Sequence, residues 1–414
     1  MGIGLEPQSA IGTAVAPTNT LIMEKLDWED KPKWLDDNGW RQWMSPLAGR
    51  QEGPIINEFS MSGKFFGDVF PFLLSNLFGD LVPTGTTTTP TTTLSATTAT
   101  PTPLAPITTI TTAVTIPAGT TIQIDIGALA EIRKTGTPSG AGPFTIPFAA
   151  GERSLLYPHL SGVAVTAVVA PFTEAFSVLN SGNTAVYGQG QPPTHTITHY
   201  QGVSAGSGAR QFPGACCSEL SLSFNAESEL VSWDSKWTSW PSVIAAVQPT
   251  SAPSSVLPIA SYRAAVGIGG PASGGTKITA LPTMKLTFSR KLEPDFTLSG
   301  LQTPYVIQRG GLTVKAEMEI IAADESPYLA MIGNTQPQFQ CVVGNGGSGA
   351  SLIQLQVDAN QAAYNAAKMD AGKENIRWAI QFDGISNTTN AGGSGGGSPC
   401  KVTVTNAVAP NVYQ

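Results

Sequence analysis

The chain has little charge for its length. Asp, Glu, Lys and Arg make up only 12% of its 414 residues, about half of the usual ~25%. The net charge of −7 and the pI near 5.1 argue against a protein that grips nucleic acid by its phosphates, because such binding needs clustered Lys and Arg. The 4 cysteines are too few for a disulfide framework. We expect Cys216 and Cys217 to be small buried hydrophobes, whereas Cys341 and Cys400 could form a pair.

Long hydrophobic runs and targeting signals are also missing. No run of apolar residues in the sequence approaches the ~18 residues that a membrane span requires. The first residues lack the basic start and apolar stretch of a signal peptide. The sequence therefore predicts a protein made in a cytoplasm without membrane insertion.

Motifs for catalysis are not found either. The sequence has no Gly-x-Ser-x-Gly elbow and no Walker or Rossmann glycine loop. His195 and His199 are four residues apart, but their flanks predict a strand, and a pair at the surface or at the core edge is favoured over a zinc site. Glu227 and Glu229 resemble a carboxylate pair, and such residues near a strand connection are usually solvated. We predict no enzyme, cofactor or metal site.

What the sequence does contain is a strong β pattern. Apolar residues make up 41%, with 44 Gly and 32 Pro, a composition typical of loop-rich β proteins. From Glu219 to Phe224 polar and apolar residues alternate strictly, which is the period of a half-buried strand. The same alternation returns in residues 284–289 and 313–320. Three such strands predict an antiparallel sheet with one dry and one wet face.

Two helices are expected beside the strands. Residues 68–79 read DVFPFLLSNLFG, where Asp68 can cap a helix, Pro71 is tolerated in its first turn and Gly79 can end it. The Ala-rich residues 358–371 predict a second helix.

Composition divides the chain into four parts. Residues 81–106 are rich in Thr and Pro and are predicted to form a semi-stiff linker. Residues 107–171 show short strands separated by glycines, as expected for a small inserted β module. Residues 1–80 and 172–414 then form the two parts of the main domain.

Several segments, in this order, resemble one known family. They read EPQSAIGTAVAPTNTLIMEKLDW, FSMSGKFFGDVFPFLLSNLFGD, GQPPTHTITHYQG, CCSELSLSFNAESELVSW, TKITALPTMKLTFSRKLEP, LTVKAEMEIIAADE and KVTVTNAVAP. The chain is similar to the major tail tube protein of long-tailed, non-contractile (siphovirus-type) bacteriophages, particularly those of actinobacterial hosts. The resemblance covers most of the chain outside residues 81–171.

The resemblance implies a mainly β fold of two packed antiparallel sheets, a tail-tube β-sandwich or barrel, with a flanking short helix. It implies that six copies close into a ring, and that rings stack into a hollow tube that delivers DNA. The implied partners are further copies of the chain and the tail tip, tape measure and tail terminator proteins, while DNA passes without specific binding. The implied location is the virion tail, after assembly in the host cytoplasm.

Under this interpretation, residues on the wet strand faces would line the bore and others would join the rings. The candidate lining residues are Glu219, Ser221, Ser223, Glu317 and Glu319. Lys285 and Lys315 share their polar phase, which argues against a uniformly acidic lining. The candidate contacts between rings are Trp28, Trp34, Trp40, Trp43 and Arg263; packing of the tryptophans within their own chain is at least as well supported. The alternatives are an adhesin whose linker holds a β domain away from a scaffold, and a hydrolase with an unrecognised site.

Overall fold

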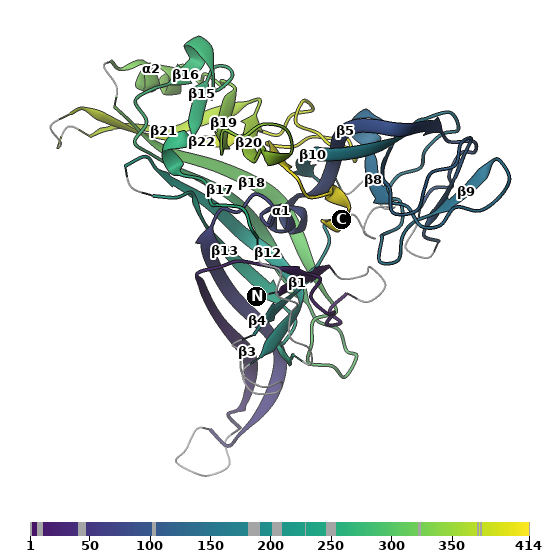
Figure 1. The fold of residues 1–414 in the computed structure, drawn as a ribbon. Helices are drawn as coiled ribbons and strands as arrows, with labels where there is room; N and C mark the ends of the chain where they lie inside the picture. Colours follow the sequence, from purple (N-terminus) through teal and green to yellow (C-terminus); the bar gives the residue numbers. More distant parts are fainter. Residues whose placement is uncertain are drawn as a thin grey trace.

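The protein is built mainly from antiparallel β-sheets around one large core (Figure 1). The computed structural model describes residues 2–5, 11–39, 47–101, 105–180, 191–200, 209–227, 229–245, 254–321, 324–370, 372 and 375–413. Two large sheets pack against each other with a short helix buried beside them, as the sequence predicted.

The large sheet contains the strands that the alternation predicted. Its long strands lie in the order β3 (Lys25–Asp37), β4 (Gly49–Lys64), β13 (Ser232–Ser239), β12 (Arg210–Asn225), β17 (Thr283–Asp295), β18 (Val306–Ile321), β22 (Arg377–Gly384) and β21 (Ala362–Asp370). Shorter strands extend it around the first half of β12: β11 (His195–His199), β1 (Gly2–Leu5), β2 (Asn19–Thr20) and β14 (Val243–Ile244).

The register gives the large sheet two different faces. Leu222 lies opposite Leu286, which lies opposite Ala316, and all three are buried. One residue along, Ser223 lies opposite Lys285 on the other face. Because side chains alternate across a strand, successive paired rows in this part of the sheet are apolar and polar in turn. The predicted amphipathic sheet is confirmed.

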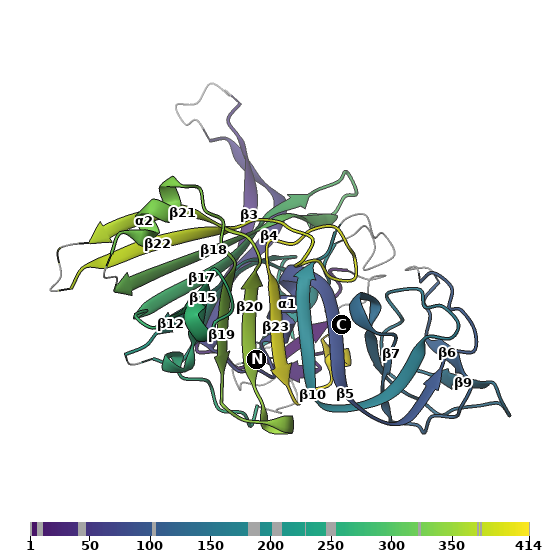
Figure 2. The same ribbon diagram turned by 90° about the horizontal axis from the view of Figure 1, so that it is seen from above.

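The second sheet covers the apolar face (Figure 2). Its strands are β16 (Lys277–Ile278), β15 (Ala265–Ile268), β19 (Phe339–Gly344), β20 (Gln354–Ala359), β23 (Lys401–Asn406), β10 (Ala164–Val178), β5 (Gly79–Thr93), β7 (Thr121–Ile124) and β8 (Glu131–Lys134). Phe339 of β19 and Phe382 of β22 join the two sheets, with ring centroids 6.1 Å apart. Both sheets contribute to one continuous apolar cluster, so the two sheet faces that meet are shielded from water.

Helix α1 (Pro71–Phe78) is buried along its whole length. Pro71 occupies its first turn and Gly79 ends it at φ +85°; a Cβ there would come within 2.8 Å of Pro192, so glycine is required. The predicted cap by Asp68 is wrong, because the N-cap position is Phe70 and makes no side-chain hydrogen bond. Phe78 packs edge-on against Phe288 of β17 at 5.5 Å, which anchors the helix on the large sheet.

The helix predicted for residues 358–371 is wrong. This stretch forms the end of β20 and then β21, which pairs with β22 from Ala362 to Asp370. Alanine favours helix only weakly, and hydrogen bonding to an existing sheet edge outweighs that preference. The second α-helix among the described residues is α2 (Ser326–Ile332), which packs on β21.

The first part of the predicted semi-stiff linker is a strand, β5 (Gly79–Thr93). β5 pairs with β10 from Gly79–Val178 to Thr93–Ala164, interrupted by two register shifts. Its threonines are extended, as expected, because β-branched residues suit strands. The extended backbone of β5 is hydrogen-bonded to β10, and the two strands form a paired stalk. Residues 79–93 are therefore not an unpaired linker.

A small β unit lies at the outer end of this stalk, on the right of Figure 2. It contains β7 and β8 and the separate pair β6 (Thr109–Thr112) and β9 (Phe144–Pro147). Its apolar cluster is distinct from the main core and includes Ile122, Ile124 and Ile146. The Leu94 amide donates to the Val163 carbonyl at 3.0 Å, so the chain enters and leaves this unit as a pair of adjacent strands.

All four cysteines are free and buried. The interpretation of Cys216 and Cys217 as buried hydrophobes is confirmed, and the possible pair of Cys341 and Cys400 is not formed. Burial raises the pKa of Cys341 to about 12, so its thiol stays neutral and unreactive.

Candidate lumen and assembly surfaces

The polar face of the large sheet brings the predicted lining residues together. Glu219, Ser221 and Ser223 lie on β12, and Glu317 and Glu319 lie on β18. The intervening strand β17 joins them by register, because Thr283 lies opposite both Asn225 and Glu319. The register places all five on the face that points away from the second sheet, where Ser221 is only 3% exposed and the other four are partly or fully exposed.

Acidic and basic side chains face each other along this surface. Glu219 pairs with Lys236 at 3.1 Å and Glu319 with Arg377 at 3.1 Å. Lys285 lies opposite Glu317. Such half-exposed ion pairs contribute little to stability, about 0–1 kcal/mol each, but they cancel local charge. The surface is therefore charge-balanced, neither acidic nor basic.

The row of long strands in the large sheet ends in two edges. Among the described strands, β3 pairs only with β4, and β21 pairs only with β22. An unpaired strand edge is a template for another chain. Edges on both sides of a sheet let identical copies continue the hydrogen-bonded array from one subunit to the next.

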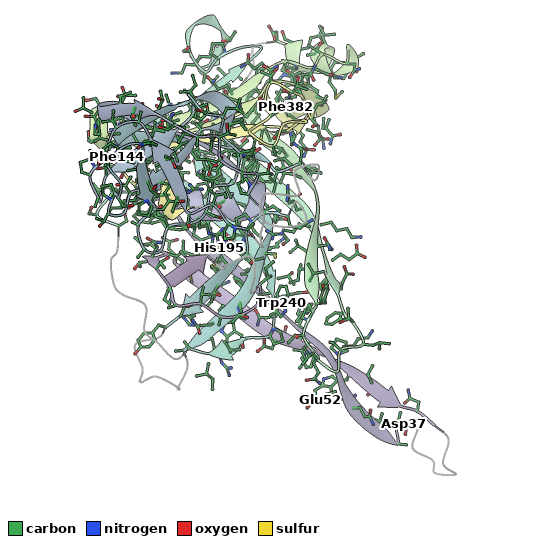
Figure 3. The ribbon with its side chains drawn as sticks, turned by 90° about the vertical axis from the view of Figure 1, so that its right-hand side faces the viewer. Asp37, Glu52, Phe144, His195, Trp240 and Phe382 are labelled. Carbon is green, nitrogen blue, oxygen red and sulfur yellow. The ribbon has the colours of Figure 1, made fainter. Side chains whose placement is uncertain are left out.

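The tryptophans of β3 have different environments. Trp28 is half-buried, with its ring 5.6 Å from Phe212 and the Arg210 guanidinium 5.7 Å from its centre. Trp34 is 47% exposed near the end of the β3–β4 hairpin, which projects from the body of the molecule (Figure 3). Trp40 and Trp43 lie outside the described residues.

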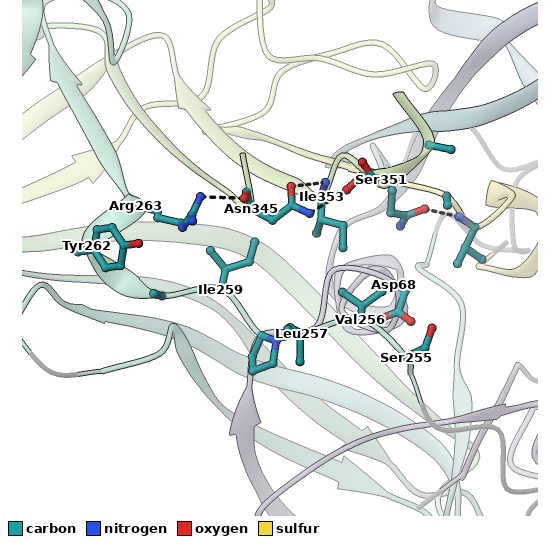
Figure 4. A pocket seen from close by; sticks show the side chains of 16 residues that line it. Asp68, Ser255, Val256, Leu257, Ile259, Tyr262, Arg263, Asn345, Ser351 and Ile353 are labelled. Atoms are coloured by element: carbon teal, nitrogen blue, oxygen red, sulfur yellow. Dashed lines mark hydrogen bonds between the residues drawn. The ribbon is translucent and has the colours of Figure 1, made fainter. Parts of the chain in front are cut away.

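Arg263 lies on a different part of the molecule, in the short 3-10 turn Ser261–Arg263. Its guanidinium donates to the Asn345 carbonyl at 2.7 Å and lies over Tyr262. Tyr262 and Arg263 line a pocket of about 730 Å³ between this turn, the 345–353 loop and the end of β23 (Figure 4). Most of the lining is apolar, and Arg263 is engaged within its own chain.

A buried polar hub centred on Asn76 holds α1 to the large sheet. The sequence analysis did not predict this hub. The Asn76 side chain donates to the Ala215 carbonyl at 2.8 Å and accepts from the Cys217 amide at 2.7 Å. It also contacts His195 Nδ1 at 2.9 Å. Arg309 donates to the Asn76 carbonyl at 3.1 Å, where the helix ends and its dipole is negative. Two polar residues, Ser75 and Asn76, in the otherwise apolar FPFLLSNLF stretch were the available signal.

The predicted histidine pair has a structural role. Both residues lie in β11 as expected, but His195 is fully buried. Burial, together with the charges of Arg153 and Arg309, lowers the pKa of His195 to about 3, so the ring is neutral. Glu227 and Glu229 are exposed near the β12–β13 connection. Across the described ranges, no group of three or more His, Cys, Asp or Glu is placed to hold a metal ion.

A second buried network lies in the small β unit. The Glu131 carboxylate accepts from the amides of Leu156 and Tyr157 at 2.9 Å each and from Arg133 at 2.6 Å. His159 joins it through Nε2 at 3.1 Å. All the charges are compensated within the unit, as burial requires. No spacing in the sequence indicated this network.

The other nitrogen of His159 makes the unit sensitive to pH. Its Nδ1 lies 3.2 Å from Asp125. Burial opposes the charged ring, but the hydrogen bonds and charges of Glu131 and Asp125 outweigh burial, so the pKa of His159 is raised.

The stabilisation that comes from a raised folded-state pKa is fully present below the unfolded pKa of about 6.5. It is lost as the pH rises through the folded-state pKa. We expect His159→Gln to lower the stability of residues 107–171 more at pH 6 than at pH 9. Hydrogen exchange of this segment at both pH values measures the difference. An equal loss at both would contradict the charged state of His159.

Neither helix in the described part of the chain is long and apolar enough to cross a membrane. Comparison with known proteins gives one family match. A family described as phage tail tube protein matches residues 2–398. No curated protein matches the chain.

Proposed function

Because the chain belongs to the phage tail tube protein family, which is structural and located in the virion tail, we propose that six copies close into a ring. Stacked rings form the hollow tube through which DNA reaches the host. The observation that carries this proposal is the large sheet, with one apolar face buried by the second sheet and a free edge on each side. Closing such sheets into a barrel pairs every edge.

Ring closure turns the polar face of each large sheet toward the bore. The lining then includes Glu219, Ser221, Ser223, Glu317 and Glu319, with Lys236 and Arg377 paired to two of them. Phosphates condense on clustered Lys and Arg, and this balanced surface offers no such cluster. DNA therefore passes without being held.

From the resemblance of the sequence we also propose a siphovirus-type tail that is assembled in the cytoplasm of an actinobacterial host. The tube would meet the tail tip at one end and the terminator at the other, with the tape measure protein inside. The small β unit would decorate the outside as a separate domain of residues 107–171, joined by the β5–β10 stalk. Among the predicted ring contacts, the exposed Trp34 is favoured over the largely covered Trp28.

Electron microscopy of the purified chain tests the proposal. We expect rings or tubes with a central hole. A chain that stays monomeric at high concentration in light scattering, with no ring in negative stain, would overturn it.

The lining makes a separate prediction. Glu219→Lys places two lysines face to face at the site of the Glu219–Lys236 pair and adds positive charge to the bore. Because both side chains are partly exposed, folding changes by less than about 1 kcal/mol. We expect virions carrying this variant to release DNA more slowly at low salt, with recovery at high salt as the charges are screened.

The matched control is Thr86→Lys/Thr88→Lys, which adds the same charge on exposed positions of β5. Its DNA release should equal that of the wild type. Normal release by Glu219→Lys at low salt would show that this face does not line the bore.

A further inference from the structure

Two exposed apolar surfaces lie at opposite ends of the large sheet. The α2 surface consists of Ile321, Tyr328, Leu329, Ile332, Met369 and Ile376. The loop surface consists of Phe296, Leu298, Leu301 and Tyr305 in the β17–β18 connection, with Trp34 and Leu35 of the adjoining hairpin. Clustered apolar side chains in water mark an interaction site or an aggregation hazard.

The α2 surface is fixed by the end of the sheet. Tyr328 stacks on Trp378 of β22 with ring centroids 6.3 Å apart, and Met369 is the register partner of Trp378. Leu329 and Ile332 remain 56% and 63% exposed. The helix is thus packed on one side and presents a row of aliphatic side chains on the other.

The loop that carries the loop surface is fixed by backbone hydrogen bonds. The Tyr305 amide donates to the Asp295 carbonyl at 2.8 Å, and the Ile55 amide of β4 donates to the Gln302 carbonyl at 2.9 Å. Leu298 is nevertheless fully exposed, at 110%, and Leu301 is 67% exposed. An ordered loop that offers leucines to water is pre-organised for a partner.

The two surfaces lie at the two ends of strand β18. This strand runs from Val306, beside the loop, to Ile321 on the α2 surface, a span of about 50 Å at ~3.3 Å per residue. Figure 1 shows α2 at one end of the sheet and the β3–β4 hairpin at the other. In Figure 3, Phe382 and Glu52 mark the same two ends.

We propose that the loop surface of one copy docks on the α2 surface of a second copy in the next ring. The inference rests on the proposed tube. A contact between two different surfaces is heterologous, and one that does not close on itself repeats as an open filament, which is the geometry of stacked rings. Exposed charges border both surfaces: Asp324 and Glu325 precede α2, and both Lys33 and Asp295 lie at the loop surface, so the apolar side chains, and not charge, define the contact.

A cysteine pair tests the contact directly. Leu298→Cys combined with Ile332→Cys should give a ladder of disulfide-linked oligomers after mild oxidation of assembled tubes. The native cysteines are buried and do not compete. Neither single variant should cross-link. Dimers from one single variant would mean that like surfaces meet, and no ladder from intact tubes would mean that these surfaces do not meet; either result overturns the contact.

Charge variants separate this contact from ring formation. Leu298→Glu/Leu301→Glu and Leu329→Glu/Ile332→Glu should each keep rings but lose at least tenfold in tube length. The matched control, Ile126→Glu/Leu160→Glu, alters the exposed surface of the small β unit, where these side chains are 73% and 70% exposed, and should leave tubes unchanged. If either variant forms normal tubes, the proposed contact is wrong, but the proposed tube function still stands. A wild type that forms no rings overturns the proposed function with it.

Discussion

Asn76→Ala is expected to destabilise the whole fold. The substitution removes the donor to the Ala215 carbonyl and the acceptor of the Cys217 amide, and it leaves His195 Nδ1 without this contact. Each orphaned buried group costs about 1–3 kcal/mol, and we expect a total loss of about 4 kcal/mol. Urea unfolding followed by tryptophan fluorescence measures the loss.

The control lies at the preceding position of the same helix. Ser75 is also buried, but its hydroxyl makes a single hydrogen bond, to the Tyr413 carbonyl at 2.8 Å. Ser75→Ala should cost about 1 kcal/mol. Equal effects of the two substitutions would show that Asn76 is not a hub and that both positions only fill space.

Glu131→Gln is expected to unfold the small β unit and leave the main core intact. The neutral amide removes the negative charge that lies 2.6 Å from the buried Arg133 guanidinium and turns donor hydrogens toward amides that need an acceptor. Breaking a buried ion pair by removing one partner costs about 3–5 kcal/mol. Hydrogen exchange should rise throughout residues 107–171.

The tryptophans report separately on the rest of the chain. None of the 8 tryptophans lies between residues 81 and 171, so the fluorescence transition should not move. Glu152→Gln is the control, since its carboxylate has one hydrogen bond, to Asn411.

Deletion of residues 95–162, closed by Asn-Gly between the adjacent ends at Leu94 and Val163, should still allow tubes to form. Loss of assembly in the deletion variant would show that the unit is integral to the tube.

The sequence predicted the parts of the fold that depend on local pattern. Alternation located β12, β17 and β18 and gave the correct face to Glu219 and Glu317, because the period of two is a property of the strand itself. The apolar stretch with Pro71 and Gly79 located α1. These features do not depend on which segments meet in space.

Predictions failed where a distant partner decides the structure. Residues 362–370 read as helix until β22 supplies an edge to pair with, and the threonines of β5 read as linker until β10 lies beside them. The Glu131 network joins residues 28 positions apart, and composition gives no sign of such a contact. The sequence pattern gives no sign that Leu298 and Leu301 are exposed. Only the fold shows that they lie together at the end of the sheet.

The orientation of the large sheet in the assembled particle is the most direct test of the account. A cryo-electron microscopy map of tubes grown from the purified chain should show Glu219 and Glu317 facing a central bore, with the small β unit outside. A map in which the second sheet or the small β unit faces the bore would contradict the assignment.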